Sequence, residues 1–505
     1  MKIFTTEDIR AIDRATIETE GVTARDLIER VADSVVSEIV SRWRPNKRTM
    51  VFAGPGNNGA DALAVARRLI EQGFAPEVFL FNIGGDKLSH ECKACREDLL
   101  KLDSVNFTEV TGTFTLPELN SSYLVIDGLF GSGLREPLVS GFMALVRYIN
   151  ESGAKVVSID IPSGMFSDWN RGSINRNIIH AALTLTVQFP RLAFMMKENA
   201  DLVGEWKVID IGLSSEAIRN THTNFQIVDA AGMKMLLKPR QPFCSKADFG
   251  NLLLVTGQYG MMGAAVLSAR ASVRSGVGKV TVHTAGWGYE VIQSQVPEAL
   301  FEADRNDSVI TEIKPVHTYS AVAIGPGIGT ADPTVNALDS FLKSATVPLV
   351  LDADALNCIS LRRTLLNMLP PRTILTPHAG EFDRLFGSHA TDEERLLTAI
   401  KVAEDYDLLI LLKGRYTALV RPDGKIYFNS TGTPALATPG SGDVLTGIIA
   451  SFLAQGYKPE IAPVAGAYIH GLAGEIAAET HGEYGVTASD IAACVGKAIR
   501  HTMGI

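Results

Sequence analysis

The sequence predicts a two-domain α/β protein whose parallel sheets are covered by helices. β-Branched and leucine-rich segments of strand length alternate with amphipathic segments of helix length along the chain. Two glycine-rich turns, at residues 54–61 and 439–443, each follow an extended stretch and precede an apolar helix-like run. At 505 residues, the chain is also too long for one ordinary core. These observations together predict two nucleotide-handling units.

Composition excludes several function classes. The chain carries a formal net charge of −9 and has no long Lys/Arg run, which argues against nucleic acid or an anionic membrane as the main partner. The first residues lack the apolar core of a signal peptide, and no apolar run approaches the roughly 18 residues that a membrane span requires. We therefore expect a cytoplasmic protein with small-molecule ligands.

Cysteine usage fits a reducing compartment, because five is an odd number and the chain is large. His90, Cys92 and Cys95 form the one metal-like cluster in the sequence. This cluster lies in a charged, helix-like stretch without a second Cys/His pair nearby. We expect an incidental surface helix there rather than a zinc site.

The elements of the first half predict a doubly wound sheet. Strands are expected at residues 49–53, 76–81, 123–127, 155–160 and 183–189. Helices are expected at residues 6–40 with a break near Gly21, and at 61–72, 87–102 and 141–151. The polar stretch at residues 214–224 is the candidate linker, because it lacks hydrophobic periodicity.

The second half begins the alternation again. Strands are expected at residues 251–256, 279–284, 321–324, 349–352, 373–376 and 408–413, with helices between them. The economical division is therefore one domain at residues 1–220 and another at 225–505.

The first glycine-rich turn reads GPGNNGAD at residues 54–61. A packed helix is expected to follow it, because Leu63, Ala66 and Leu69 share one face. Free backbone N–H groups at such a helix N-terminus bind phosphate, so a pyrophosphate is expected on residues 56–59. The alternative interpretation is a purely structural tight turn.

Two further predicted strands end in a carboxylate followed by small residues, at Asp127 and Asp160. Ligands of open α/β sheets bind beyond the carboxyl ends of the strands, so both side chains are expected in the same cleft as the glycine turn. Asn58, Asp127 and Ser163 offer oxygen atoms without imidazole or thiolate, which suits a hard cation. The alternative is that Asp127 and Asp160 only cap the loops that follow them.

Residues 57–61, 127–135 and 160–164 resemble the NAD(P)H-hydrate epimerase family, with a likeness that spans residues 1–220. This resemblance implies a Rossmann-like doubly wound sheet and a K⁺ ion held by Asn58, Asp127 and Ser163. It implies that a hydrated nicotinamide dinucleotide contacts Asn57, Asn58, Gly59, Ala60, Asp61, Gly131, Ser132, Gly133, Leu134, Arg135, Glu136, Pro137 and Asp160. Asp127 and Asp160 are both candidates for the proton-transfer or orienting group.

The chain departs from this family at Ala60 and Ala62, where the family has glycines, and at residues 28–32, which read IERVA instead of MERAG. Two additional methyl groups beside a phosphate-binding backbone are expected to narrow that pocket.

The second glycine-rich turn, PGSGD at residues 439–443, precedes a helix apolar enough to be buried. Its N–H groups are expected to face developing phosphoryl charge, with Asp443 as a base or hydroxyl-orienting group. A simple helix cap is the alternative. Other predicted strands are followed by glycine-rich or titratable segments at residues 257–265, 324–329, 351–357, 376–381 and 412–417.

These segments resemble the ribokinase-like superfamily, and specifically the ADP-dependent NAD(P)H-hydrate dehydratase domain, over residues 225–505. The resemblance implies an α/β/α domain in which the hydrated dinucleotide contacts Ala264, Gly327, His378 and Asp443. It implies that ADP, with Mg²⁺, contacts Lys413, Gly414, Arg415, Tyr416, Thr417 and Gly442. The family commonly has SHKG where residues 244–247 read CSKA, so Lys246 is present and the histidine is not.

The combined resemblance implies repair of hydrated NADH and NADPH in a homo-oligomer. A kinase-like site phosphorylates the C6 hydroxyl of the S hydrate and so makes it a better leaving group, while an epimerase interconverts the R and S forms. Two alternatives remain open at this point. The second half resembles vitamin and sugar kinases in fold, and the first half is alternatively a non-catalytic nucleotide-binding module.

Overall fold

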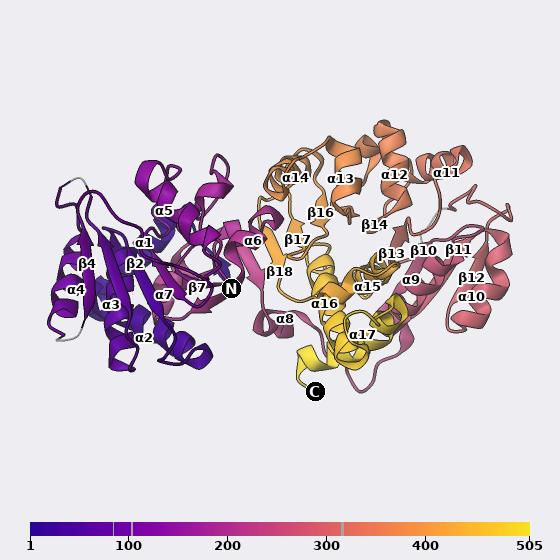
Figure 1. Cartoon of the computed structure of the whole chain (residues 1–505). Coiled ribbons are helices and arrows are strands. Elements are labelled where there is room, and N and C mark those ends of the chain that lie inside the picture. The colour runs from indigo at the N-terminus through magenta and orange to yellow at the C-terminus, as the bar shows by residue number, and fades with distance from the viewer. Residues whose placement is uncertain (84, 103–104, 315–317) are drawn as a thin grey trace. The chain divides into compact units, whose positions relative to one another are not determined.

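A computed structural model describes residues 1–83, 85–102, 105–314 and 318–505 (Figure 1). The chain divides into two compact units. One unit consists of Lys2–Thr223, and the other consists of Asn224–Ile505 together with Met1. Each unit is built around a sheet that is largely parallel, so the predicted α/β class is confirmed.

The sheet of the unit Lys2–Thr223 is parallel throughout, with the order β4-β3-β2-β5-β6-β7-β8. Its strands are β2 (Thr49–Ala53), β3 (Glu77–Phe81), β4 (Asn106–Val110), β5 (Leu124–Gly128), β6 (Lys155–Ile159), β7 (Leu183–Val187) and β8 (Glu205–Ile209). The order reverses between β2 and β5, since successive strands extend away from that point on both sides. A ligand crevice is expected where the loops after β2 and β5 leave the sheet.

Helices and short elements complete this unit. They are β1 (Lys2–Ile3), α1 (Thr6–Glu20), α2 (Ala24–Arg42), α3 (Asn57–Glu71), α4 (His90–Leu100), α5 (Ser140–Glu151), α6 (Ala200–Val203) and α7 (Ser215–Asn220). The sequence did not indicate β4 and β8, because these outer strands are half exposed and carry polar side chains. Helix α7 lies inside the stretch expected to be a linker, and its Ala217 and Ile218 pack against the core.

The cysteines of α4 are not on the surface as expected. Cys92 is 0% exposed and Cys95 2% exposed, and both belong to the core under the sheet. Burial raises the pKa of each thiol to about 12, so both are neutral packing groups at physiological pH.

The larger unit has the strand order β9-β18-β17-β16-β15-β14-β13-β10-β11-β12. These strands are β9 (Phe225–Val228), β10 (Asn251–Val255), β11 (Lys279–Thr284), β12 (Leu300–Ala303), β13 (Ala321–Ile324), β14 (Leu349–Leu351), β15 (Ile374–Leu375), β16 (Leu409–Leu412), β17 (Ala418–Val420) and β18 (Ile426–Asn429). β17 is antiparallel to both of its neighbours, and the remaining neighbours in this order pair in parallel. This sheet reverses between β10 and β13.

Helices cover both faces of this sheet, with α11 to α14 on one side and α15 to α17 on the other (Figure 1). The helices of the unit are α8 (Ala230–Leu236), α9 (Met262–Arg274), α10 (Tyr289–Gln295), α11 (Asp332–Leu342), α12 (Asp354–Leu361), α13 (Ala379–Phe386), α14 (Asp392–Tyr406), α15 (Ser441–Ala454), α16 (Ala462–His481) and α17 (Ala488–Met503). In the part of the chain that the structure describes, no helix combines the length and hydrophobicity that a membrane crossing requires.

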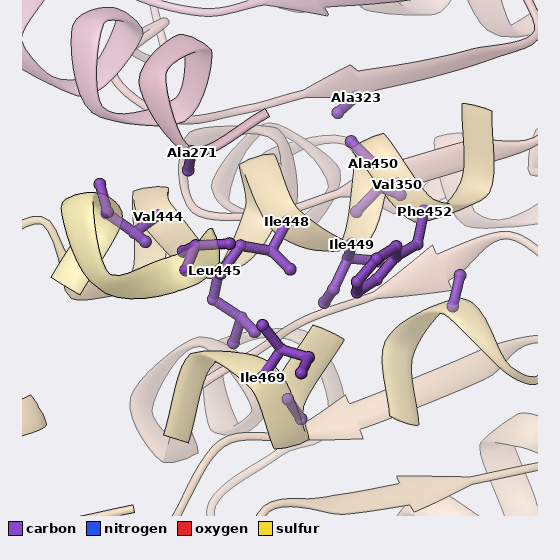
Figure 2. Close-up of a cluster of buried hydrophobic side chains, with 14 of the residues drawn as sticks. Ala271, Ala323, Val350, Val444, Leu445, Ile448, Ile449, Ala450, Phe452 and Ile469 are labelled. Atoms are coloured by element: carbon purple, nitrogen blue, oxygen red, sulfur yellow. The ribbon is translucent and has the colours of Figure 1, made fainter. Parts of the chain in front are cut away.

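Helix α15 is buried in the core of the larger unit. Figure 2 shows Ile448 and its neighbours among side chains from α9, β14 and α16. The backbones of α9 and α15 approach closely at Gly447, where a Cβ atom would lie 2.3 Å from the Ser268 carbonyl oxygen. Because this packing fixes the helix on all sides, its N-terminus is a rigid platform.

Candidate functional site

The turn after β2 and the loop after β5 are locked together. The N–H of Gly54 donates to the Gly128 carbonyl at 3.0 Å. A Cβ atom on Gly54 would lie 1.8 Å from the Leu129 carbonyl oxygen, and one on Gly59 would lie 1.8 Å from the Gly54 oxygen. Only glycine tolerates these approaches, so the predicted turn is a close backbone junction at the point where the sheet reverses.

Helix α3 begins at Asn57, earlier than the sequence predicts, so residues 57–60 are its first turn rather than a loop. Its N-cap, Gly56, supplies no side-chain acceptor. The first N–H groups of α3 therefore remain available to an anion beyond the end of β2.

The methyl groups of Ala60 and Ala62 do not narrow this pocket, so that expectation is wrong. Both residues are 0% exposed and belong to the core between α3 and the sheet. The Ala62 Cβ lies 2.4 Å from where a Cβ on Gly128 would stand. The two methyl groups point into the core, where they add apolar packing.

Asp127 is fully buried at the end of β5 and is surrounded by donors. Ser163 donates to it through Oγ at 2.6 Å and through its backbone N–H at 2.9 Å, and Ser158 Oγ donates at 2.8 Å. Burial raises the pKa of Asp127, although these hydrogen bonds oppose that shift. Nδ2 of Asn58 is buried without a hydrogen-bond partner among the described residues. Asn58 also lies beside the loop after β5, with its Cγ 3.2 Å from the position of a Cβ on Gly131.

Asp160 follows β6 in a left-handed conformation, with φ of 68°. It accepts a hydrogen bond from the Ser132 N–H at 3.0 Å and pairs with Arg191, whose side chain is 2% exposed. Burial opposes ionisation of Asp160, but the charge and hydrogen bond of Arg191, together with hydrogen bonds from Ser132, outweigh it and lower the pKa. Asp160 is therefore a fixed carboxylate that holds the loop at Ser132.

Sequence reasoning missed Asp13 and Arg191. Burial raises the pKa of Asp13, on α1, to about 6, with Arg191 lowering it and Asp160 raising it. Burial also raises the pKa of Asp61 well above its ordinary value, and the charges of Asp160 and Asp13 add to that shift. Asp13 and Asp61 both lie on helices, where no strand-end signal marks a carboxyl group with a raised pKa.

In the larger unit, the N-terminus of α15 carries the second glycine-rich turn. Gly440 has φ of 85°, and Asp443 stands in the first helical turn. The pKa of Asp443 is raised to about 6. Burial is the largest cause, the charge of Asp352 adds to the rise, and the charge of Lys413 opposes it. A carboxyl group with this pKa ionises close to working pH, as a general base must.

Lys413 lies under this N-terminus. Its Nζ donates to Oδ1 of Asp352 at 2.9 Å and lies 3.6 Å from the position of a Cβ on Gly442. The other oxygen of Asp352 accepts from Thr446 Oγ1 at 2.6 Å. Burial alone would lower the pKa of Lys413, but the carboxylates of Asp352 and Glu381 outweigh it and raise the pKa. A charged ammonium group is thereby held at a helix N-terminus.

Ala264 and Gly327 meet where the larger sheet reverses. A Cβ on Gly327 would lie 3.0 Å from the Ala264 Cβ and 2.9 Å from the Met261 carbonyl oxygen. The Gly257 N–H donates to the Pro326 carbonyl at 2.8 Å, which ties the two loops together. These two predicted site residues are therefore in contact.

His378 lies after β15, next to the strand end that carries Lys413, and the two residues form a parallel bridge. Its Nδ1 accepts from the N–H groups of Gly380 at 3.0 Å and Glu381 at 3.3 Å, so the imidazole caps α13. The side chain is 54% exposed, and its Nε2 lies 3.4 Å from Oε1 of Glu381.

Residues 414–417 form a closed turn after Lys413. Thr417 Oγ1 donates to the Gly414 carbonyl at 3.0 Å, and the Arg415 guanidinium lies 5.0 Å from the centre of the Tyr416 ring. The turn therefore presents an exposed edge of cation and aromatic ring.

In this unit, sequence reasoning missed His470. Its Nε2 lies 3.1 Å from Ser441 Oγ, inside the first turn of α15. Burial lowers the pKa of His470 to about 4, so the imidazole is neutral. It comes from the long apolar helix α16, where a lone histidine carries no local signal.

Comparisons with known proteins assign both units. Residues 252–496 match the family described as NAD(P)H-hydrate dehydratase, and residues 24–193 match the family described as YjeF-related protein N-terminus. The bifunctional NAD(P)H-hydrate repair enzyme Nnr of Moorella thermoacetica is 33% identical, over 97% of this chain and 95% of its own length. That of Thermofilum pendens is also 33% identical, over 99% and 96%.

Among solved structures, a similar chain is the ADP/ATP-dependent NAD(P)H-hydrate dehydratase from Bacillus subtilis, co-crystallised with ATP/Mg²⁺. It is 29% identical, covers 56% of this chain and 100% of its own, and has a TM-score of 0.48.

Proposed function

Because the chain belongs to the family of bifunctional NAD(P)H-hydrate repair enzymes, we propose that it restores hydrated NADH and NADPH through two separate sites. The unit Lys2–Thr223 exchanges the R and S forms at C6 of the hydrate. The larger unit dehydrates the S form with ADP. The reduced coenzyme is the product of both reactions in sequence.

Dehydration requires a better leaving group than hydroxide. In the larger unit Asp443 takes the proton of the C6 hydroxyl as its oxygen attacks the terminal phosphorus of ADP, which releases AMP. The N–H groups at the start of α15 and the ammonium group of Lys413 stabilise the phosphoryl charge. The ring-nitrogen electron pair then expels phosphate, and loss of a proton from C5 restores the C5=C6 bond.

Magnesium accompanies the nucleotide in this proposal. Among the described residues, no group of three or more His, Cys, Asp or Glu side chains is placed to hold a metal ion. A Mg²⁺ ion that keeps water and phosphate ligands fits such a site better than one in a dedicated protein cage. When bound, it neutralises phosphate charge, while His378, Ala264 and Gly327 position the hydrated ring.

Epimer exchange is assigned to the crevice at β2 and β5. Asp160 orients the loop at Ser132 as a fixed carboxylate. Asp61, in the first turns of α3, is the proposed proton-transfer group beside it, and burial raises its pKa. Asn58, Asp127 and Ser163 offer an oxygen-rich set of side chains, which fits K⁺. When bound, K⁺ supplies positive charge beside the dinucleotide.

The observation that carries the proposal is Asp443 beside a lysine held under the N-terminus of a buried helix. Replacing Asp443 with Asn is expected to abolish ADP-dependent recovery of NADH. Epimer exchange by the same protein serves as the internal control and is expected to persist. Retained dehydration in this variant would refute the role of Asp443.

The proposed function also includes the ligands, the assembly and the cellular location of the protein. Its partners are ADP and the hydrates of NADH and NADPH, which are called NADHX and NADPHX. The protein is a cytoplasmic homo-oligomer. Light scattering on the purified chain tests the oligomeric part, because a monomeric mass would contradict it.

A further inference from the structure

One face of α1 lies against the loop after β5. Thr6 Oγ1 donates to the Ser132 carbonyl at 3.1 Å. One turn later, Nη2 of Arg10 lies 2.9 Å from the position that a Cβ on Gly133 would occupy. Residues spaced by four share a helix face, so α1 presents Thr6 and Arg10 to the same loop. The guanidinium group can lie there because Gly133 has no side chain.

Several carboxyl groups surround this crevice. Asp13, Asp61 and Asp160 contribute carboxyl groups, and Arg191 is engaged by the charges of Asp160 and Asp13. Arg10 is exposed, and within the described ranges it has no ion-pair or hydrogen-bond partner. A dinucleotide brings a pyrophosphate, which a cation on α1 can bind in addition to Arg135 of the loop after β5.

We propose that Arg10 binds a phosphate oxygen of the hydrated dinucleotide, so that α1 forms a substrate-binding wall of the epimerase site. This inference rests on the proposed function and adds a residue to it. The planar guanidinium donates two parallel N–H groups, which match phosphate geometry. Gly133 keeps the space over the loop open for this side chain.

The test uses the full chain without ADP, so that only epimer exchange is measured. Arg10→Gln is expected to raise KM for the hydrate about ten-fold, the size expected for one charge-assisted hydrogen bond, with kcat unchanged. Arg10→Lys is expected to recover part of this loss, because it keeps the charge but not the fork. Arg44→Gln is the matched control, since it makes the same charge change at an exposed residue between α2 and β2, at the end of β2 opposite the crevice.

The outcomes separate this inference from the function on which it rests. A wild-type chain without epimer exchange would overturn the proposed function and the role of Arg10 together. An active wild type with KM unchanged in Arg10→Gln would overturn the role of Arg10 alone. An equal rise in KM for Arg44→Gln would do the same, because the effect would then be general electrostatics. Tm and ADP-dependent dehydration are expected to match the wild type in each variant.

Discussion

Lys413 Nζ lies 2.9 Å from Oδ1 of Asp352, directly under the N-terminus of α15. The Asp352 carboxylate fixes the Lys413 ammonium group beside Gly442. A Cβ atom on Gly442 would lie 3.6 Å from Nζ of Lys413. Thr446, on α15 itself, holds the second oxygen of Asp352 at 2.6 Å. Strand ends and the buried helix thereby share one polar network at the proposed phosphoryl-transfer site.

Lys413→Met is expected to lower kcat for ADP-dependent dehydration about 100-fold, since removal of one preorganised charge-stabilising group costs on that order. Epimer exchange is expected to be unchanged. Steady-state kinetics of both reactions on one preparation check this. A fall in both activities would point to loss of folding, and unchanged dehydration would contradict the role of the lysine.

Dehydration is expected to depend on pH through Asp443. Its pKa is raised to about 6, mainly by burial, so the base form is present above that pH and is lost as pH falls through it. The kcat of dehydration should rise toward a plateau above pH about 6. Single-turnover rates of dehydration, measured at pH values from about 5 to about 8, give this profile. A flat profile would exclude Asp443 as the titrating base.

His470 is expected to make folding stability depend on pH. Its pKa is lowered to about 4 by burial, so the unfolded chain binds a proton between pH 6.5 and 4 while the folded protein does not. Stability from the neutral imidazole is present above pH 6.5 and is lost as pH falls toward 4, by about 3 kcal/mol.

Denaturant unfolding of the wild type and His470→Gln at several pH values measures this term. The Gln variant retains a polar partner for Ser441 but cannot take up the proton. The stability difference between the two proteins should change across this window. A difference that is constant with pH would show that His470 does not titrate on unfolding.

Ser163 and Ser158 separate the proposed K⁺ site from the hydrogen bonds around Asp127. Both hydroxyl groups donate to this carboxylate, at 2.6 and 2.8 Å, but only Ser163 belongs to the proposed K⁺ ligands. Ser163→Ala is expected to raise the K⁺ concentration for half-maximal epimer exchange about ten-fold, whereas Ser158→Ala retains the wild-type value. Equal effects of the two substitutions would contradict the ligand assignment.

The sequence was most informative where strands end. Asp127 lies at the end of β5 and Asp160 directly follows β6. Parallel strands bring their carboxyl ends to one edge, so their convergence could be predicted. Gly54 and Gly59 could be placed at a tight turn, because the glycine-rich segment directly follows a predicted strand. In the structure, their close approaches to other backbone atoms exclude side chains.

The other features of the two sites could not be predicted, because they depend on packing between segments that are distant in the sequence. Arg191 reaches the crevice from the loop after β7, and Asp13 reaches it from α1. Neither position carries a sequence motif. The direction of the Ala62 methyl group follows from its contact with Gly128, which periodicity alone does not reveal. His470 meets Ser441 only because α16 packs beside α15.

The most direct test of the account is the stoichiometry of repair by the full-length protein. It would be given both epimers of hydrated NADH with ADP, Mg²⁺ and K⁺. The account predicts complete recovery of NADH, with one AMP and one phosphate formed for each NADH, and epimer exchange alone when ADP is omitted. Accumulation of a stable phosphorylated hydrate, or recovery of NADH without formation of AMP, would contradict it.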